Sequence, residues 1–233
     1  EMARDFLNGK LSANAFDDLD MEDGKYIGVN VRRIDAPSKV TGALRYAGDM
    51  VLPGMLHVQV LRSPHPHARI VSIDTTDAEA VMGVEGIVTC ADVPGQDGFG
   101  VFVADQPIMA RDKVRYVGEQ IAAVAAETLA AAREAVKKIK VEYELLPAVF
   151  DPDEAMVAGA PVVHDYAQDN LVKHIPIRNG NVEDGFAQSD VIVEQTYETQ
   201  QVEHAYLETE AGVAYVDHDG VVTVHSPSQN ITH

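Results

Sequence analysis

The alternation of apolar and polar residues is clearest in the middle of the chain. Gln120–Ala126 is a continuous run of small, mostly apolar residues, which is typical of a strand buried on both faces. Leu129–Ile139 places apolar residues at helical spacing and carries lysines near its end, where positive charge suits the helix dipole. Ile139–Leu145 then alternates apolar residues with lysine and glutamate. The pattern predicts a buried strand, a helix and a half-exposed strand, which together form an α/β unit.

Shorter patterns before this unit predict three more strands and one short helix. The helix is capped by Thr75 or Thr76 and ends near Gly83. Pro37 and Gly42 predict a loop rather than a helix around them. The strands are expected at Met55–Leu61, Ala68–Ile73 and Val84–Thr89.

The last third of the chain predicts a strand and a hairpin. Asp190–Thr199 places Val191, Val193 and Tyr197 on one side of an expected strand. Gly212–Val216 and Val221–His225 flank an Asp-Gly turn, which is a strong hairpin signal. If unpaired, such strands expose edges, and we expect them to favour association with further chain.

Charge divides the sequence and limits its partners. Residues 1–26 are polar and acidic, which predicts a linker or an arm that orders on a neighbouring subunit. The formal net charge of −19 argues against a nucleic acid or an anionic membrane surface as partner. From residue 151 onwards the sequence has fifteen Asp or Glu but only two Lys or Arg, Lys173 and Arg178. This section is therefore a poor phosphate site unless backbone amides or other parts of the molecule supply hydrogen-bond donors.

A single cysteine, Cys90, excludes an intrachain disulfide and an iron–sulfur cluster held by four thiolates of this chain. We expect Cys90 to be a small buried apolar residue at the end of a strand. No run is long enough to span a bilayer, and no signal peptide is present, so a cytoplasmic location is expected. The start at Glu1 and the end at His233 suggest a piece of a longer protein.

Candidate chemistry is sparse. His65 and His67 could share a face and bind zinc, but no third ligand lies nearby, so a structural or solvent-exposed role is expected. His204 and Glu208 are four residues apart and are expected to form a buried pair that organises a loop. Dinucleotide-binding, phosphate-loop and serine-hydrolase motifs are all absent. The residues alone leave the function open.

The amino-acid sequences of several segments resemble those of one protein family. Val114–Thr128 followed by Val141–Val149 resembles the α/β hammerhead domain of the molybdenum-binding subunit in the xanthine dehydrogenase and aldehyde oxidase family. The similarity covers roughly residues 27–233. The further segments that match in order are Arg33-Ile-Asp35, Lys39-Val-Thr-Gly42, Leu61–Ile70, Val84–Gly95, Ala187–Glu194, Glu203–Glu208 and Ser226-Pro-Ser-Gln229.

The resemblance implies an α+β fold. A hammerhead domain at 27–150 would be followed at 151–233 by the incomplete beginning of a mixed α/β molybdopterin-binding domain. It also implies hydroxylation of a purine, another N-heterocycle or an aldehyde with water-derived oxygen. The molybdopterin–molybdenum cofactor carries the redox chemistry, while 2Fe-2S clusters and often FAD lie on partner domains or subunits. Residues Tyr206-Leu-Glu-Thr209 weakly favour an N-heterocycle.

Few functional residues carry over from the family. Gln229 aligns with a glutamine beside the molybdenum, although an ordinary polar residue at a strand end is the alternative. No catalytic residue and no metal ligand is assigned, because the family's catalytic glutamate would lie beyond His233. We therefore expect the N-terminal portion of a large subunit that is inactive alone and needs the remainder, an iron–sulfur partner and a small-molecule substrate. The alternatives are a stand-alone hammerhead binding or assembly module without catalysis, and a metal-dependent hydrolase that uses His65, His67 or His204.

Overall fold

The computed structural model describes residues 33–228 except 96–97, 101 and 207–208. The predicted acidic arm at 1–26, Glu208 and Gln229 therefore lie outside the described residues. The chain divides into two compact units, one of residues 51–201 and one of residues 1–50 with 202–233. No helix in the described part of the chain is both long and apolar enough to cross a membrane.

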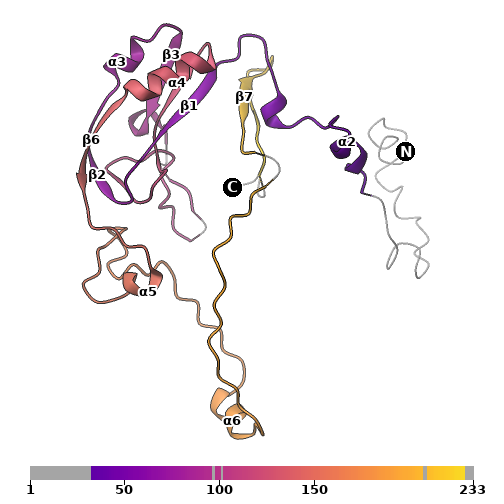
Figure 1. Ribbon diagram of the computed structural model, residues 1–233, viewed down its shortest axis with the longest axis vertical. Coiled ribbons are helices and arrows are strands. Elements are labelled where there is room, and N and C mark those ends of the chain that lie inside the picture. Colours follow the sequence, from indigo (N-terminus) through magenta and orange to yellow (C-terminus); the bar gives the residue numbers. More distant parts are fainter. Residues whose placement is uncertain (1–32, 96–97, 101, 207–208, 229–233) are drawn as a thin grey trace. The chain divides into compact units, whose positions relative to one another are not determined.

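The larger unit is built on two three-stranded antiparallel sheets (Figure 1). One sheet has the order β1-β5-β3 and the other β4-β2-β6. The strands predicted before residue 150, the central helix and the Asp-Gly hairpin are confirmed to within two residues at each end. The bounds are β1 His57–Arg62, β2 Ala68–Asp74, α3 Thr76–Glu79, β3 Val84–Thr89, β4 Lys113–Val114, β5 Gln120–Ala126, α4 Leu129–Lys138 and β6 Lys140–Leu145.

Strand β5 lies at the centre of its sheet and is buried on both faces, as its apolar run predicts. Ala122 and Val124 face a core that includes Ala135 of α4 and Ala78 of α3. Ile121 faces a second core formed with Ala68, Ala110 and Val114. Because many of these residues are alanines, α4 packs directly on β1 and β5 (Figure 1).

Local signals define the ends of the helices. The Thr128 side chain accepts a hydrogen bond from the Ala131 amide and caps α4, and Lys137 and Lys138 occupy its last turn. Asp151 caps α5 (Pro152–Ala155), and Asn181 caps α6 (Val182–Ala187) in the same way. These capped helices are the regular elements that the structure describes between residues 146 and 201.

Three details differ from the sequence predictions. Pro37 lies in a short helix, α2 (Ala36–Val40), because proline fits the first helical turn, and Gly42 at φ +70° follows the helix end. Cys90 is half-buried in a 3-10 turn (Cys90–Asp92) rather than fully buried in a strand. Leu145, placed on the buried side of β6, is 66% exposed.

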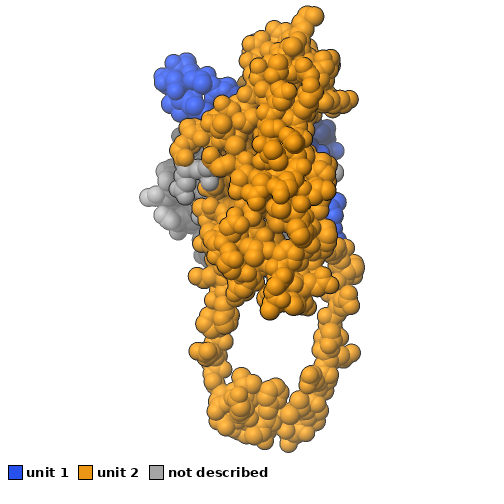
Figure 2. All heavy atoms as spheres, turned by 90° about the vertical axis from the view of Figure 1, so that its left-hand side faces the viewer, with its two compact units in different colours: residues 1–50, 202–233 blue, residues 51–201 orange. Residues whose placement is uncertain are grey.

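The predicted strand at Asp190–Thr199 is wrong for this chain. The segment has no strand assignment and pairs with no described residue. Figure 2 shows open space between the two extended arms that flank α6. A strand requires a neighbour for its backbone groups, and the described part of the chain supplies none here.

The smaller unit contains α2, a 3-10 turn at Ala47–Asp49 and the hairpin of β7 (Val213–Val216) and β8 (Val222–His225). The hairpin register pairs Val213 with His225 and Val216 with Val222. Its turn is closed by the Asp217 side chain, which accepts hydrogen bonds from the amides of Asp219 and Val221.

Candidate functional site

A cavity of the larger unit lies beside the start of β5. One wall is the loop before β4, where the Phe99 and Gln106 backbones exchange hydrogen bonds of 2.9 and 3.0 Å. A Cβ on Gly100 would clash with the Val103 carbonyl oxygen. Only glycine fits there without a backbone shift.

The floor of the cavity is the turn that joins β4 to β5. The buried Glu119 carboxylate accepts a hydrogen bond from the Arg115 amide and so closes this turn. The Gly118 amide donates to the Ser63 carbonyl at 2.8 Å, and the Arg62 guanidinium donates to the Gly118 carbonyl at 2.8 Å. The turn is therefore fixed to the end of β1.

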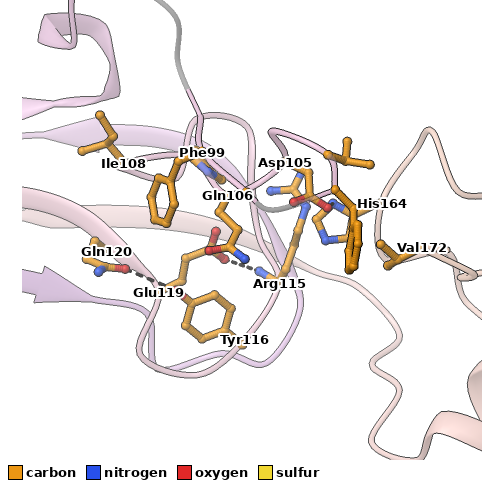
Figure 3. Close-up of a pocket in the computed structure, with 14 residues that line it drawn as sticks. Phe99, Asp105, Gln106, Ile108, Arg115, Tyr116, Glu119, Gln120, His164 and Val172 are labelled. Carbon is orange, nitrogen blue, oxygen red and sulfur yellow. Dashed lines mark hydrogen bonds and ion pairs between the residues drawn. The ribbon is translucent and has the colours of Figure 1, made fainter. Parts of the chain in front are cut away.

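The cavity has a volume of about 660 Å³ and combines aromatic walls with a polar floor (Figure 3). Its apolar side chains are substantially exposed, with Phe99 at 58% and Phe102 at 61%. Other side chains that line the cavity are Ile108, Arg115, Tyr116, Glu119, Gln120 and His164.

Burial dominates the electrostatics of the floor. It raises the pKa of Glu119, although the hydrogen bond from the Arg115 amide and the Arg115 charge act in the opposite direction. The Arg115 guanidinium donates to the Lys113 carbonyl at 3.2 Å, while its Nε atom is buried without a partner. Burial also raises the pKa of Tyr116.

A second polar group connects the cavity to the segment after β6. His164 Nδ1 lies 3.7 Å from the Asp105 carboxylate, and Tyr166 donates its hydroxyl hydrogen bond to the same oxygen. Burial, followed by repulsion from Arg115, lowers the pKa of His164, so the neutral imidazole is favoured at neutral pH. The buried Lys113 ammonium donates to Asp165 at 2.9 Å, and this bond lowers the pKa of the Asp165 carboxyl.

This arrangement suits contact more than reaction. Glu119, Asp105 and Lys113 each have a partner that fixes them in the fold. Among the described residues that line the cavity there is no serine, threonine or cysteine to act as a nucleophile. The exposed aromatic walls over a fixed polar floor are what a docking segment or an aromatic ligand requires.

The histidines of the zinc hypothesis have separate structural partners. His67 is buried and its Nδ1 lies 2.6 Å from the Pro147 carbonyl oxygen, while the His65 ring contacts Tyr143 edge to face at 4.8 Å. His204 stacks on Tyr206 at 5.5 Å, and no helix is assigned there. In the described part of the chain, the carboxylates and imidazoles close enough to share a cation are those of Asp217, His218 and Asp219, in the exposed hairpin turn.

Sequence reasoning did not single out the residues of the cavity floor. Arg115 and Glu119 lie just before the strand predicted at Gln120–Ala126, in a segment that resembles the hammerhead domain but gives neither residue a role. The available signal was the presence of two charged residues within five positions of a mostly apolar strand. Charged residues near the start of a buried strand lie beside the core. If they are buried, they need hydrogen-bond or ionic partners.

A pterin cofactor carries anionic groups, so a chain that holds it needs positively charged side chains or other hydrogen-bond donors. Residues 163–228 contain Lys173 and Arg178 as their basic residues, and both are exposed. Neither side chain lines the cavity beside β5 or the neighbouring cavity lined by Phe150 and Asn170. These two side chains therefore form no anion site at either cavity, so the anionic groups of such a cofactor would need other donors, such as backbone amides or another part of the molecule.

Two family models match consecutive parts of the chain. Residues 41–147 match the α/β hammerhead domain of aldehyde oxidase and xanthine dehydrogenase. Residues 163–233 match the molybdopterin cofactor-binding domain. Together the two models account for most of the chain, and the first contains both sheets of the larger unit.

Two relatives illustrate the similarity. The chain is 45% identical over 198 residues to a probable xanthine dehydrogenase subunit of Bacillus subtilis, covering 85% of this chain and 26% of that protein. It is 39% identical over 209 residues to the nicotinate dehydrogenase large molybdopterin subunit of Eubacterium barkeri, covering 90% of this chain and 49% of that one. The chain thus spans a quarter to a half of these relatives.

Solved structures of related proteins are similar to this chain over most of its length. Quinoline 2-oxidoreductase from Pseudomonas putida matches with a TM-score of 0.75 and 36% identity, over 87% of this chain and 27% of that chain. Aldehyde oxidoreductase from Desulfovibrio gigas matches with a TM-score of 0.76 and 31% identity, over 96% and 26%. The fold is therefore α+β, a hammerhead domain followed by molybdopterin-binding sequence. The chain belongs to the xanthine dehydrogenase and aldehyde oxidase family.

Proposed function

We propose that this chain is the N-terminal portion of a molybdenum hydroxylase large subunit. In this proposal residues 27–150 form the hammerhead domain and residues 151–233 the first part of the molybdopterin-binding domain. The observation that carries it is the order of the two family matches, at 41–147 and 163–233. The complete subunit would hydroxylate a purine, another N-heterocycle or an aldehyde with oxygen from water, and this portion alone would be inactive.

The cofactor contacts proposed for this chain are few. Gln229 would help to hold the molybdenum cofactor, because its side-chain amide could donate a hydrogen bond to it. When bound, the cofactor would supply the oxidation–reduction chemistry, and the chain would contribute position and hydrogen bonds. The 2Fe-2S clusters would lie on partner domains or subunits, because the single cysteine excludes a four-thiolate cluster here. FAD, in a complex that uses it, would also lie on a partner.

The substrate class is proposed to be an N-heterocycle. Support comes from the names of similar proteins, which include a nicotinate dehydrogenase and a quinoline oxidoreductase. An aldehyde oxidoreductase also matches, at lower identity. A cytoplasmic location fits the same proposal.

The first experiment is to purify the protein from its native source and to measure molybdenum per chain. The proposal expects near-stoichiometric molybdenum in an assembly larger than this chain, and no molybdenum on the chain produced alone. Turnover of nicotinate, hypoxanthine and an aldehyde would then assign the substrate class. Replacing Gln229 with alanine in the whole assembly should reduce turnover, with Gln188→Ala, an exposed position just after α6, as the matched control.

The second candidate is a stand-alone hammerhead module that binds or assembles a partner without catalysis. The cavity walled by the exposed Phe99 and Phe102 favours it. A metal-free monomer recovered both from the native source and from recombinant expression would support this candidate and contradict the first.

A further inference from the structure

The segment of residues 190–201 is extended and unpaired throughout. Within the described part of the chain none of its residues makes a backbone–backbone hydrogen bond, and its side chains make one hydrogen bond, from the Tyr197 hydroxyl to Gln195. Twelve consecutive residues therefore present free amide and carbonyl groups. An extended backbone with such groups is a template for pairing with another strand.

The sequence of this segment is suited to a sheet and not to a protected edge. It contains Val191, Ile192, Val193, Thr196 and Tyr197, which are residue types enriched in strands. It has no glycine, proline or lysine. Natural edge strands commonly carry lysine, proline or a bulge to prevent pairing, so the composition indicates that this segment is meant to be covered.

The two faces of the segment differ. Alternate residues of an extended chain point to opposite sides, which places Val191, Val193 and Tyr197 together. These side chains are 78%, 79% and 81% exposed. The opposite face carries Glu194 and Glu198, whose carboxylates are costly to bury, and has Ile192 as its one apolar side chain. The apolar face is therefore the one that a partner covers, and the acidic face stays in water.

We infer that residues 190–201 form a docking strand that is completed by a β-strand from the remainder of the molybdenum-binding subunit. This inference rests on the proposed function. The molybdopterin-binding model that matches 163–233 includes the segment, while the chain spans only 26% of the xanthine dehydrogenase relative. The remaining length of such a subunit is the source of the partner strand. Strand addition would satisfy the free backbone groups and cover the apolar face in one step.

Amide hydrogen exchange tests the inference directly. The amides of residues 190–201 are measured in the chain alone and in the molybdenum-containing assembly from the native source. We expect exchange to slow by about a hundredfold or more in the assembly, as for other paired strands. Fast exchange of these amides in an assembly that contains molybdenum would overturn the inference and leave the proposed function standing.

A matched pair of variants tests which face is covered. Val193→Asp puts a carboxylate on the apolar face, and Thr196→Asp puts the same charge on the acidic face. We expect Val193→Asp to lower recovery of the assembly about tenfold or more, because the charge would be buried, and Thr196→Asp to change it less than about twofold. Thermal melts of the isolated variants verify folding, which neither exposed site should disturb. Equal losses would overturn the assignment of the faces.

Two further outcomes separate the alternatives. Protection that appears in the isolated chain and rises with its concentration would mean that a second copy occupies the strand, which would overturn the named partner. Absence of molybdenum and of any partner in native preparations would contradict the proposed function, and the inference would fall with it.

Discussion

At the scale of single residues, Glu119 is a buried carboxylate that also fixes the shape of a turn. Its carboxylate closes the turn between β4 and β5 by accepting the Arg115 amide, and it is 3% exposed. A carboxylate this buried resists ionisation, and the hydrogen bond compensates only in part, so its pKa stays raised. The same residue therefore shapes the cavity floor and makes the stability of the fold dependent on pH.

The sign of this dependence follows from the raised pKa. The folded state favours the protonated Glu119 side chain. The stability that this side chain contributes is therefore fully present below its pKa in the unfolded chain. That stability is lost as the pH rises through its pKa in the folded chain. Glu119→Gln keeps the oxygen acceptor without the charge. We expect the variant to gain free energy of unfolding relative to the native chain as the pH rises from about 4 to 7.

Denaturant unfolding at several pH values measures this difference. The control is Glu85→Gln, an exposed position on β3 that also removes one negative charge. If Glu119→Gln and the native chain keep a constant difference across the pH range, burial of the Glu119 carboxylate does not control its ionisation.

At the scale of elements, the contact between α4 and the sheet depends on small side chains. Ala132 and Ala135 are completely buried, and Ala135 belongs to the same core as Ala122 and Val124 of β5. Interiors are close-packed, so additional methyl groups must displace neighbours. The alanine-rich sequence of α4 thus sets how closely the helix approaches the strands.

Ala135→Leu should destabilise the chain by about 1–3 kcal/mol, because the larger side chain overpacks this contact. Ala130→Leu in the same helix is the control. Ala130 is exposed, and leucine is nearly as good a helix former as alanine, so a change within about 0.5 kcal/mol is expected. Chemical denaturation of both variants measures the two changes. Similar losses would show that α4 does not pack as described.

Sequence patterns predicted those elements whose partners lie within the chain. The apolar run of β5 and the helical spacing of α4 were sufficient because each is covered by its own neighbours. The pattern at Asp190–Thr199 was equally regular, yet pairing depends on a partner that local periodicity does not describe. The proximity of Arg115 to His164 at the cavity was missed for a related reason, since β5, α4 and β6 lie between these two residues in the sequence.

At the scale of the whole molecule, the chain combines well-packed sheets with long exposed stretches. Residues 171–201 carry exposed apolar side chains such as Ile177 at 88% and Val193 at 79%. The described structure gives this stretch one regular element, α6. Local stability should therefore be highest in the two sheets and lowest in these arms.

Limited trypsin digestion checks this contrast. Within residues 51–201 we expect the first cuts after Lys173 and Arg178, which lie exposed in an extended arm, well before any cut after the buried Lys113. Lys173→Gln with Arg178→Gln should remove these early products. Early cleavage within the two sheets would contradict the assignment of the stable core. Mass spectrometry of the products identifies each site.

The position of β5 also has a consequence during synthesis. β1 and β3 pair only with β5 among the named strands, so neither has a neighbour until β5 has been made. Roughly 60 residues separate the end of β1 from the start of β5, and ribosomes add about 5–20 residues per second, so β1 waits for about 3–12 seconds. Over that interval the nascent chain exposes sheet edges to its surroundings. Chaperone demand should therefore depend on translation speed between residues 62 and 126, and slow codons in that interval should lower the yield of folded protein.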